Sequence, residues 1–276
     1  MIKEKEASGV LTERAAELPL VWADAGRAHE AAHQLLSQQA RDLAQRLQTR
    51  LVWEQPPHNC LVLRLDAYGL ALGLSDMASQ HMLRPDFSQL LPRVQAQRLG
   101  GELLVRAARI RHPRAKVPLA LDATAGLGED SLLLAAAGFE VVLCEYNPVV
   151  AALLEDTLSR AKLQPELVAI CSRMRLYTGD SISYLQRLDC PPDLILLDPM
   201  FPPRSKSAKV KKKFQLLQMV EQTCVDEAAL LQAALNARPR KVVIKRPLKG
   251  PALAGIRPDY SLAGKTIRFD CLLVHS

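Results

Sequence analysis

Short apolar runs alternate with longer segments of helical periodicity from residue 118 to the end of the chain. Runs of four to six residues that are rich in Val, Leu and Ile are typical of strands buried on both faces of a sheet. The predicted strands cover residues 118–123, 140–144, 175–178, 193–197, 241–245 and 266–274. The predicted helices cover residues 130–137, 148–161, 182–188 and 226–237. This alternation predicts an α/β fold with a Rossmann-like, doubly wound sheet.

The N-terminal part has a different pattern. Residues 1 to about 20 mix charges without a clear period, which predicts a loosely docked extension. The segment 25–47 is rich in Ala, Gln, Leu and Arg, and its leucines are spaced for one face of a helix. These leucines are Leu35, Leu36, Leu43 and Leu47.

Two alternating runs follow, at residues 61–65 and 70–74, and the turn between them contains Gly69. Such a pair predicts a β-hairpin. We therefore predict two units along the chain. Residues 1–100 would form an N-terminal extension and a small α+β cap, and residues 101–276 would form the Rossmann-like domain.

The segment 90–109 joins the two predicted units. Its second half has helical spacing, carried by Leu103, Leu104, Ala107 and Ala108. Five arginines would lie on or near one side of this segment: Arg93, Arg98, Arg106, Arg109 and Arg111. A solvated helix face explains them simply. Because the helix is expected to lead into the first strand of the sheet, contact with substrate phosphate is the alternative interpretation.

Charge and composition narrow the class of protein. Lys and Arg outnumber Asp and Glu by 36 to 29, a net charge of +7 that fits a nucleic-acid partner. The six cysteines are scattered without the spacing of a zinc site, so we expect reduced core cysteines and no metal. The first residues lack the apolar stretch of a secretory signal, and no run reaches the ~18 apolar residues of a membrane span. These observations predict a cytoplasmic protein without a membrane partner.

A glycine turn follows the first strand of the predicted sheet, in the run Asp122-Ala-Thr-Ala-Gly-Leu-Gly128. Glycines at a strand-to-helix turn let the backbone approach a ligand closely, and Gly126 and Gly128 are placed for this role. The run also half-matches the dinucleotide-binding pattern, with Ser131 in the place of the third glycine. The turn therefore predicts a site for a nucleotide-like cofactor, with Asp122, Gly126 and Gly128 among its binding residues.

Two later strand ends carry polar residues that suit a nucleoside. Glu145 ends the second strand, where a carboxylate can accept hydrogen bonds from both ribose hydroxyls. Asp180 and Ser181 follow the third strand and can bind the edge of an adenine. Ribose recognition of this kind serves NAD and S-adenosylmethionine equally, so these residues leave the choice of cofactor open.

The run Asp198-Pro-Met-Phe-Pro202 follows the fourth strand and carries the candidate catalytic residues. An exocyclic amine on a nucleobase is a poor nucleophile, because its lone pair is delocalised into the ring. Asp198 and the carbonyl of Pro199 can accept its N–H bonds, and Phe201 can stack on the base. With a sulfonium methyl donor, most of the catalysis would be positioning. The run predicts a methyltransferase that acts on a base nitrogen.

A basic loop follows this run and would lie beside the base pocket. Residues 204–213 contain six basic residues and no acidic one: Arg204, Lys206, Lys209, Lys211, Lys212 and Lys213. Lys245 and Arg246, at the end of the fifth strand, would add to the same rim. The loop predicts a surface that binds RNA phosphates.

The chain resembles the bacterial small-subunit ribosomal RNA methyltransferases of the J type over residues 100–276. The motifs that carry the resemblance are 122–130, Glu145-Tyr-Asn-Pro-Val-Val-Ala-Ala-Leu-Leu154, Asp198-Pro-Met-Phe-Pro202, the lysine stretch 206–212, Lys245-Arg-Pro247 and Arg268-Phe-Asp270. It implies a class I S-adenosylmethionine-dependent methyltransferase that modifies N2 of a guanine in 16S rRNA, free or within the 30S subunit.

By position, the resemblance implies that seven residues contact S-adenosylmethionine: Glu129, Asp130, Glu145, Tyr146, Asp180, Ser181 and Asp198. The family usually has arginine where this chain has Glu129 and Tyr146, so the contacts at these two positions are expected from backbone atoms.

Three other functions fit part of the pattern. A methyltransferase with another amine target, such as DNA adenine or a protein glutamine, is the first, although the usual adenine motif has proline where Met200 stands. An NAD-dependent oxidoreductase is the second, and it would need a proton-transfer residue at a strand end, which the histidines do not supply. A non-catalytic RNA-binding module is the third, and it would have no use for an intact cofactor loop.

Overall fold

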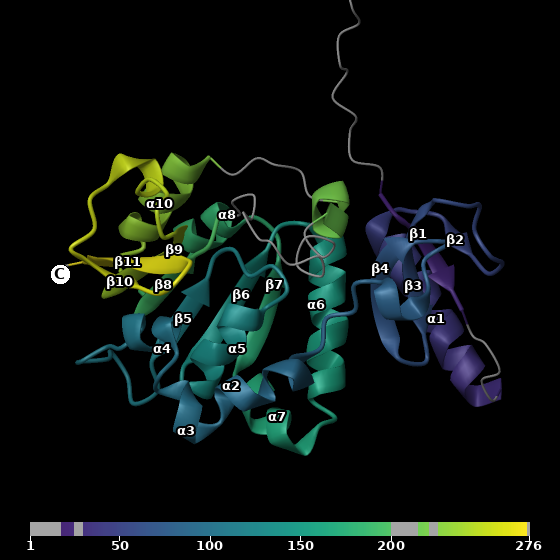
Figure 1. Ribbon diagram of the computed structural model, residues 1–276, viewed down its shortest axis with the longest axis horizontal. Helices are drawn as coiled ribbons and strands as arrows, with labels where there is room; N and C mark the ends of the chain where they lie inside the picture. Colours follow the sequence, from purple (N-terminus) through teal and green to yellow (C-terminus); the bar gives the residue numbers. More distant parts are fainter. Residues whose placement is uncertain (1–17, 25–29, 200–214, 221–225, 275–276) are drawn as a thin grey trace, which may run out of the picture.

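The computed structural model describes residues 18–24, 30–199, 215–220 and 226–274. These residues form two sheets that lie side by side with one helix standing between them (Figure 1). Within this part of the chain, no helix combines the length and the apolar character needed to cross a bilayer.

The larger sheet has seven strands in the order β10-β11-β9-β8-β5-β6-β7. Strands β5 to β9 are parallel to one another, β11 pairs antiparallel with β9, and β10 pairs antiparallel with β11. The strands are β5 (Leu119–Asp122), β6 (Glu140–Glu145), β7 (Met174–Thr178), β8 (Leu194–Leu197), β9 (Lys241–Pro247), β10 (Tyr260–Ala263) and β11 (Ile267–Leu273). The predicted Rossmann-like α/β sheet is confirmed, and the strand order reverses beside β5, where such sheets bind ligands.

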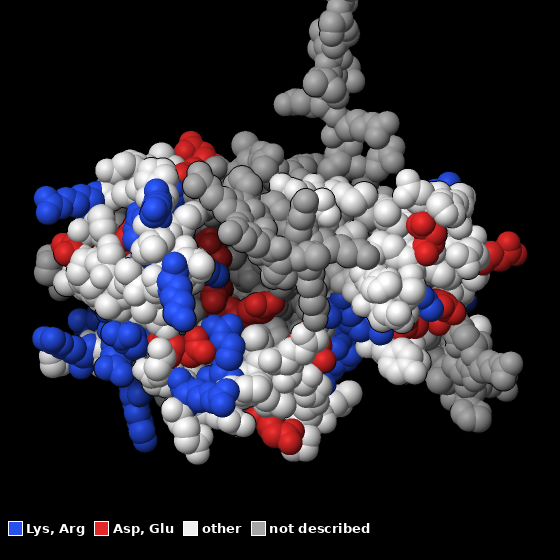
Figure 2. Space-filling view, in the orientation of Figure 1, with Lys and Arg blue, Asp and Glu red and all other residues white. Residues whose placement is uncertain are grey.

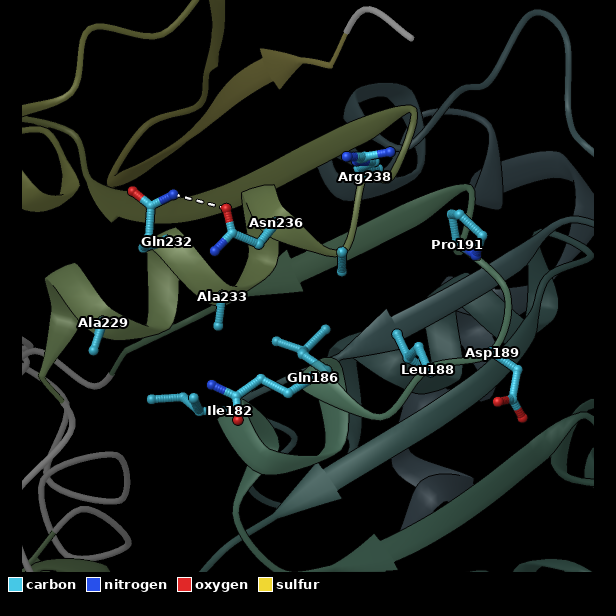
Figure 3. A pocket seen from close by; sticks show the side chains of 12 residues that line it. Ile182, Gln186, Leu188, Asp189, Pro191, Ala229, Gln232, Ala233, Asn236 and Arg238 are labelled. Atoms are coloured by element: carbon cyan, nitrogen blue, oxygen red, sulfur yellow. Dashed lines mark hydrogen bonds between the residues drawn. The ribbon is translucent and has the colours of Figure 1, made fainter.

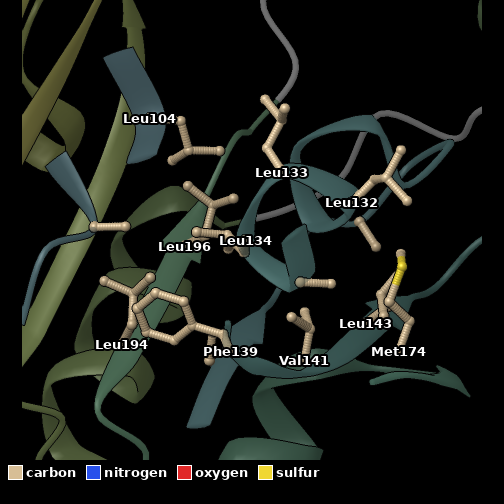
Figure 4. Close-up of a cluster of buried hydrophobic side chains, with 14 of the residues drawn as sticks. Leu104, Leu132, Leu133, Leu134, Phe139, Val141, Leu143, Met174, Leu194 and Leu196 are labelled. Carbon is tan, nitrogen blue, oxygen red and sulfur yellow. The ribbon is translucent and has the colours of Figure 1, made fainter. Parts of the chain in front are cut away.

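Helices cover both faces of this sheet, which explains its unbroken apolar strands. Alternate residues of one strand enter different cores, as Leu194 and Leu196 do on one face of β8 and Ile195 and Leu197 on the other. The first core lies under α4 and α5 (Figure 4), and the second lies under α8 and α10. The helices are α4 (Leu103–Ala107), α5 (Glu129–Ala136), α6 (Pro148–Ala161), α7 (Pro165–Cys171), α8 (Ser181–Gln186) and α10 (Glu227–Asn236). Residues 215–220 are also helical.

The smaller sheet has the strand order β2-β1-β3-β4, and its core is shared with one long helix of the N-terminal part and with α6. Its elements are β1 (Leu20–Ala23), α1 (Glu30–Leu47), β2 (Leu51–Val52), β3 (Leu61–Asp66) and β4 (Gly69–Leu74). The predicted hairpin is confirmed as the antiparallel pair β3–β4. Strand β1 was not predicted, because its four residues are too few for a period and its partner β3 lies far along the chain.

Helix α1 confirms the predicted helix over its described part but corrects the predicted apolar face. Leu36, Leu43 and Leu47 are buried together with Ala40, whereas Leu35 is 63% exposed. Spacings of three and four residues from Leu36 reach the other buried positions, and Leu35 lies one residue outside that phase.

The segment that joins the sheets contains several short helical turns. The sequence had predicted a single helix that leads into β5. The turns of the joining segment are η1 (Ser79–His81), η2 (Phe87–Leu90), α2 (Leu91–Val94), α3 (Ala96–Leu99) and α4. A further short turn, η3 (Leu253–Gly255), follows β9 in the larger unit. The backbone is extended at Gln95 and Glu102, which ends α2 and separates α3 from α4. Arg93 is bound to Glu102 through two hydrogen bonds of 2.9 and 2.8 Å, while Arg98, Arg106, Arg109 and Arg111 are exposed.

Candidate active site

The glycine turn between β5 and α5 has the backbone conformation that the sequence predicted. Gly126 and Gly128 have φ values of 54° and 76°, in the left-handed region that favours glycine. A Cβ on Gly128 would lie 2.7 Å from Leu154 Cδ1, so this glycine packs directly on α6. A Cβ on Gly126 would meet nothing within 4 Å, so the turn has open space on the side where a ligand would approach.

Asp122 lies underneath this turn and binds its backbone. Its carboxylate is 2% exposed and accepts hydrogen bonds from the Thr124 N–H at 3.2 Å and from the Ser131 hydroxyl at 2.6 Å. Burial raises the pKa of Asp122 to about 7, against the effect of the Ser131 hydrogen bond. The Asp122 carboxylate therefore shapes the loop, and the predicted part of Asp122 in cofactor binding stays a prediction.

Glu145 ends β6 and reaches across to the same turn. One carboxylate oxygen accepts the Gly126 N–H and the other accepts the Asn147 N–H, both at 2.8 Å. A carboxylate can accept several hydrogen bonds, so Glu145 is a suitable residue type to bind ribose hydroxyls as well. The neighbouring Tyr146 is 66% exposed, and Glu129 is also exposed.

Asp180 and Ser181 lie after β7 at the same edge of the sheet. Asp180 caps α8 by accepting hydrogen bonds from the Ile182 and Ser183 N–H groups and from the Ser183 hydroxyl. Burial alone would raise the pKa of Asp180, but these hydrogen bonds lower it below its usual value. Asp180 therefore presents a charged carboxylate next to the end of β6, where the Gly179 N–H donates to the Glu145 carbonyl at 2.9 Å.

Asp198 directly follows β8, and its backbone is bound to the glycine turn. Its N–H donates to the Thr124 hydroxyl at 2.6 Å, which joins the candidate catalytic run to the candidate cofactor loop. Burial raises the pKa of the Asp198 carboxyl, and the neighbouring Lys245 ammonium opposes this effect. Pro199, next in the chain, is buried.

Lys245 of β9 connects the two parts of the site through its side chain. Its Nζ lies 2.6 Å from Asp130 Oδ2, in the first turn of α5, and 2.9 Å from Asp198 Oδ2. Burial would lower the pKa of Lys245, but the two carboxylates raise it above the usual lysine value. Figure 2 shows acidic side chains gathered around a hollow in the part of the molecule that contains the seven-stranded sheet, and Lys and Arg side chains border this hollow.

Known proteins are similar in sequence to this chain over most of its length. A family model described as "Putative SAM-dependent methyltransferase" matches residues 43–274. A protein from Stutzerimonas stutzeri named Ribosomal RNA small subunit methyltransferase J is 43% identical, over 75% of this chain and 81% of that protein. A protein of the same name from Thioalkalivibrio sulfidiphilus is 42% identical, over 76% and 83% of the two chains. The chain belongs to the ribosomal RNA small subunit methyltransferase J family.

A solved structure supports the same assignment. The crystal structure of a SAM-dependent methyltransferase from Neisseria gonorrhoeae matches with a TM-score of 0.70 and 30% identity, and the match covers 93% of this chain and 96% of that one. Membership of the methyltransferase J family confirms the predicted resemblance, the enzyme class and the S-adenosylmethionine cofactor. It sets aside the NAD-dependent oxidoreductase and the non-catalytic RNA-binding module.

The observed site fits the methyl donor of this family. The space over Gly126 admits a ligand against the backbone, and Glu145 offers two acceptors for a ribose. Asp130, Asp198 and Lys245 carry a net charge of −1 when ionised, which complements a sulfonium cation. No group of three or more His, Cys, Asp or Glu side chains in the described part of the chain is arranged to hold a metal ion.

Of the predicted RNA-binding residues, the structure describes Lys245 and Arg246. Arg246 is 1% exposed and donates from Nε to the Pro251 carbonyl at 2.9 Å, so its side chain does not form part of a surface rim. Lys245, predicted for the same rim, pairs with the two carboxylates instead. Phe201 and the basic loop lie outside the described residues: Arg204, Lys206, Lys209, Lys211, Lys212 and Lys213.

Sequence reasoning missed the residues that hold the site together. Thr124 lies within the predicted cofactor loop, yet its link to Asp198 depends on two strands being neighbours in the sheet. Ser131 was noticed only as a departure from the glycine pattern, and its buried hydroxyl binds Asp122. A polar residue in the place of a pattern glycine is the signal that could have identified it.

A groove between α8 and α10, of about 600 Å³, lies apart from these residues (Figure 3). Its lining includes Ile182, Gln186, Leu188, Ala229 and Gln232, and none of the predicted site residues. Gln232 donates to Asn236 at 2.9 Å on the α10 side. The groove is not part of the methyl-transfer site.

Proposed function

We propose that this protein transfers a methyl group from S-adenosylmethionine to the exocyclic N2 of a guanine in 16S rRNA. The observation that carries the proposal is the hydrogen bond from the Asp198 N–H to Thr124, which joins the candidate base-binding run to the cofactor loop. The names of the relatives support a ribosomal RNA of the small subunit as the substrate.

The cofactor would lie along the carboxyl ends of β5, β6 and β7. Gly126 and Gly128 would approach it through their backbone, and Glu145 would accept hydrogen bonds from the ribose hydroxyls. Asp180 and Ser181 would bind the adenine edge. Glu129 and Tyr146, whose side chains are exposed, would contribute through their backbone atoms.

The bound cofactor supplies a methyl group on a cationic sulfur. Asp198 and the Pro199 carbonyl would accept hydrogen bonds from the target amine and direct its lone pair toward that methyl group. Phe201 would stack on the base and fix its plane. Because these groups act by positioning, no general acid is required, and the proton that the amine loses on methylation would pass to Asp198 or to solvent.

RNA would bind through phosphate contacts around this site. The loop that carries Arg204 to Lys213 would border the base pocket. Figure 2 shows further basic side chains over the region of α3, α4 and the loop that follows, and four arginines of this region are exposed. They are Arg98, Arg106, Arg109 and Arg111. Residues 103–121 contain no Asp or Glu, so the positive charge there is not neutralised within the segment.

Two broader assignments belong to the same proposal. Residues 1–100 would act as a small α+β unit beside the methyltransferase domain at residues 101–276. The substrate would be small-subunit rRNA, either free or in the 30S subunit, and the enzyme would work in the cytoplasm, where ribosomes are assembled.

Asp198→Ala tests the proposal at the residue that would hold the amine. We expect kcat to fall by roughly 10²- to 10³-fold, because the acceptor that orients the amine is lost. The melting temperature should change little, and the affinity for S-adenosylhomocysteine should fall by no more than a few-fold. N2-methylguanine would be measured by nucleoside mass spectrometry on 30S subunits from a strain that lacks the enzyme.

Asp189→Ala is the matched control, since it removes an exposed carboxylate outside the site. Near-normal methylation by Asp198→Ala would contradict the proposed role. Transfer of label to DNA adenine or to protein glutamine, with none to rRNA, would favour the alternative amine targets.

A further inference from the structure

The ammonium group of Lys245 lies between carboxylates from two separate elements of the site. Asp130 belongs to α5, which continues the cofactor loop, and Asp198 belongs to the candidate catalytic run. The Lys245 side chain is only 26% exposed, and both carboxylates are partly buried. Three charged groups that share little water interact more strongly than surface ions do.

Two carboxylates in such a place require a cation. Like charges at short range each disfavour ionisation of the other, and Asp130 raises the pKa of Asp198 in this way, in addition to the larger effect of burial. Lys245 is the group that opposes both effects, with its Nζ 2.9 Å from Asp198 Oδ2. Its contact with Asp198 uses one carboxylate oxygen and fixes the direction of the other.

We propose that Lys245 is a positioning residue for methyl transfer, which holds Asp198 as an oriented carboxylate toward the target amine and ties it to Asp130 of the cofactor loop. This inference rests on the proposed role of Asp198. It replaces the expected role of Lys245 in binding RNA phosphate, because the ammonium is occupied inside the site.

The other groups around Asp198 do not duplicate this role. Arg246 of β9 favours the Asp198 carboxylate at longer range, but its guanidinium is directed to Pro251 and Glu227. Asp122 of β5 and Asp130 of α5 are acidic, and the Thr124 hydroxyl accepts the Asp198 N–H. Without Lys245, Asp198 would face two carboxyl groups with no cation in contact among the residues that the structure describes.

Lys245→Met removes the charge and keeps most of the side-chain volume. We expect kcat near neutral pH to fall by about 10- to 100-fold. Removal of the cation raises the pKa of Asp198, so its carboxylate forms only at higher pH. The acid limb of the kcat–pH profile should therefore move up by about one pH unit, and raising the pH should recover part of the loss. The KM for 30S subunits should stay within about threefold, and Lys245→Arg should restore most of the activity.

A measurement without turnover tests the same contact. Lys245→Met should lower the melting temperature of the free enzyme by several degrees, and adding Asp198→Asn to that variant should return most of the loss. S-adenosylhomocysteine affinity, measured by calorimetry, should stay within a few-fold of wild type. Lys249→Met is the control, because it removes an exposed lysine near the end of the same strand.

Three outcomes would overturn the inference. They are an unchanged pH profile, a loss of kcat that is equal at every pH, and a double variant whose change in melting temperature equals the sum of the changes in the two single variants. Failure of the proposed function gives a different result, since the wild-type enzyme would then leave 30S guanine unmethylated while the thermal cycle still reported the Lys245–Asp198 contact.

Discussion

At the scale of single residues, buried polar side chains hold the loops of this site in place. Asp122 binds the glycine turn, and Asp193, also buried, accepts backbone N–H groups from Arg114 and Leu119 in the segment that enters β5. Lys241 donates to two carbonyls at the end of α4. Buried polar groups are stable only when they are paired, so these residues define the backbone around them.

Asp122→Asn should change how stability depends on pH. The ordinary pKa of 3.8 applies in the unfolded chain, and burial raises it to about 7 in the folded protein. As pH rises between these values, the unfolded chain loses its proton first, so the wild type loses stability relative to the Asn variant. From pH 5 to pH 8 the free energy of unfolding of the variant should rise by roughly 2–3 kcal/mol relative to wild type.

Urea unfolding at several pH values measures this difference. Asp189→Asn, at an exposed position, should show a constant difference from wild type. A constant difference for Asp122→Asn as well would mean that Asp122 is ionised at little cost in the folded protein.

At the scale of elements, the glycine turn depends on its contact with α6. Gly128→Ala adds a methyl group 2.7 Å from Leu154 Cδ1 and 3.2 Å from Phe87 Cζ, at a φ of 76°. Backbone strain of about 1 kcal/mol and overpacking of about 1–3 kcal/mol should together lower the free energy of unfolding by about 2–4 kcal/mol.

Gly138→Ala separates the two causes of this loss. Its φ is 100°, but the added methyl group would meet nothing within 4 Å, so only the backbone strain remains. Denaturant unfolding of both variants gives the comparison. Equal losses would show that α6 yields to the methyl group without cost.

Elements with strong local patterns could be predicted from the sequence. Helix α6 begins at Pro148 and ends at Ala161 as expected, because its apolar period and its first proline agree. Strand β10 was not predicted, since it lies at the sheet edge and is mostly exposed. Helix α7 was also missed, because its seven residues give too short a period.

The residues of the site divide in the same way, into those with a local sequence signal and those without one. The positions of Gly126, Glu145 and Asp198 could be predicted because each follows a strand of a parallel sheet. The pairing of Lys245 could not, because Asp130 lies 115 residues earlier and only the strand order brings them together. A lysine beside arginine at a strand end indicates a basic surface equally well, which is how the sequence was interpreted.

At the scale of the whole molecule, α6 serves both sheets (Figure 1). Leu154 and Leu158 pack into the seven-stranded sheet, while Val149, Val150 and Leu153 pack against the smaller unit. Leu216, Leu217 and Val220 of the helical segment 215–220 enter the same cluster as the smaller sheet. The N-terminal unit therefore supports a segment close in sequence to the predicted RNA-binding loop.

The arginines around α4 should contribute to RNA affinity through charge alone. Arg106→Ala with Arg109→Ala should weaken binding to 30S subunits and reduce the slope of log K against log salt by about 1 to 2, because phosphate contacts release counterions. Filter binding across a salt series measures the slope. Arg175→Ala with Arg187→Ala removes two exposed arginines from other elements and should leave the slope unchanged. Equal slopes for both pairs would exclude RNA from the α4 surface.

The shared helix α6 also constrains how this chain can change over time. A substitution that alters the volume of Val150 or Leu153 requires a compensating change in the small sheet. Substitutions on the opposite side of the same helix, at Leu154 or Leu158, require compensating changes in the core of the seven-stranded sheet. Exchanging the small sheet between relatives would therefore require grafting part of α6 with it, and the two halves of the gene are expected to diverge in step.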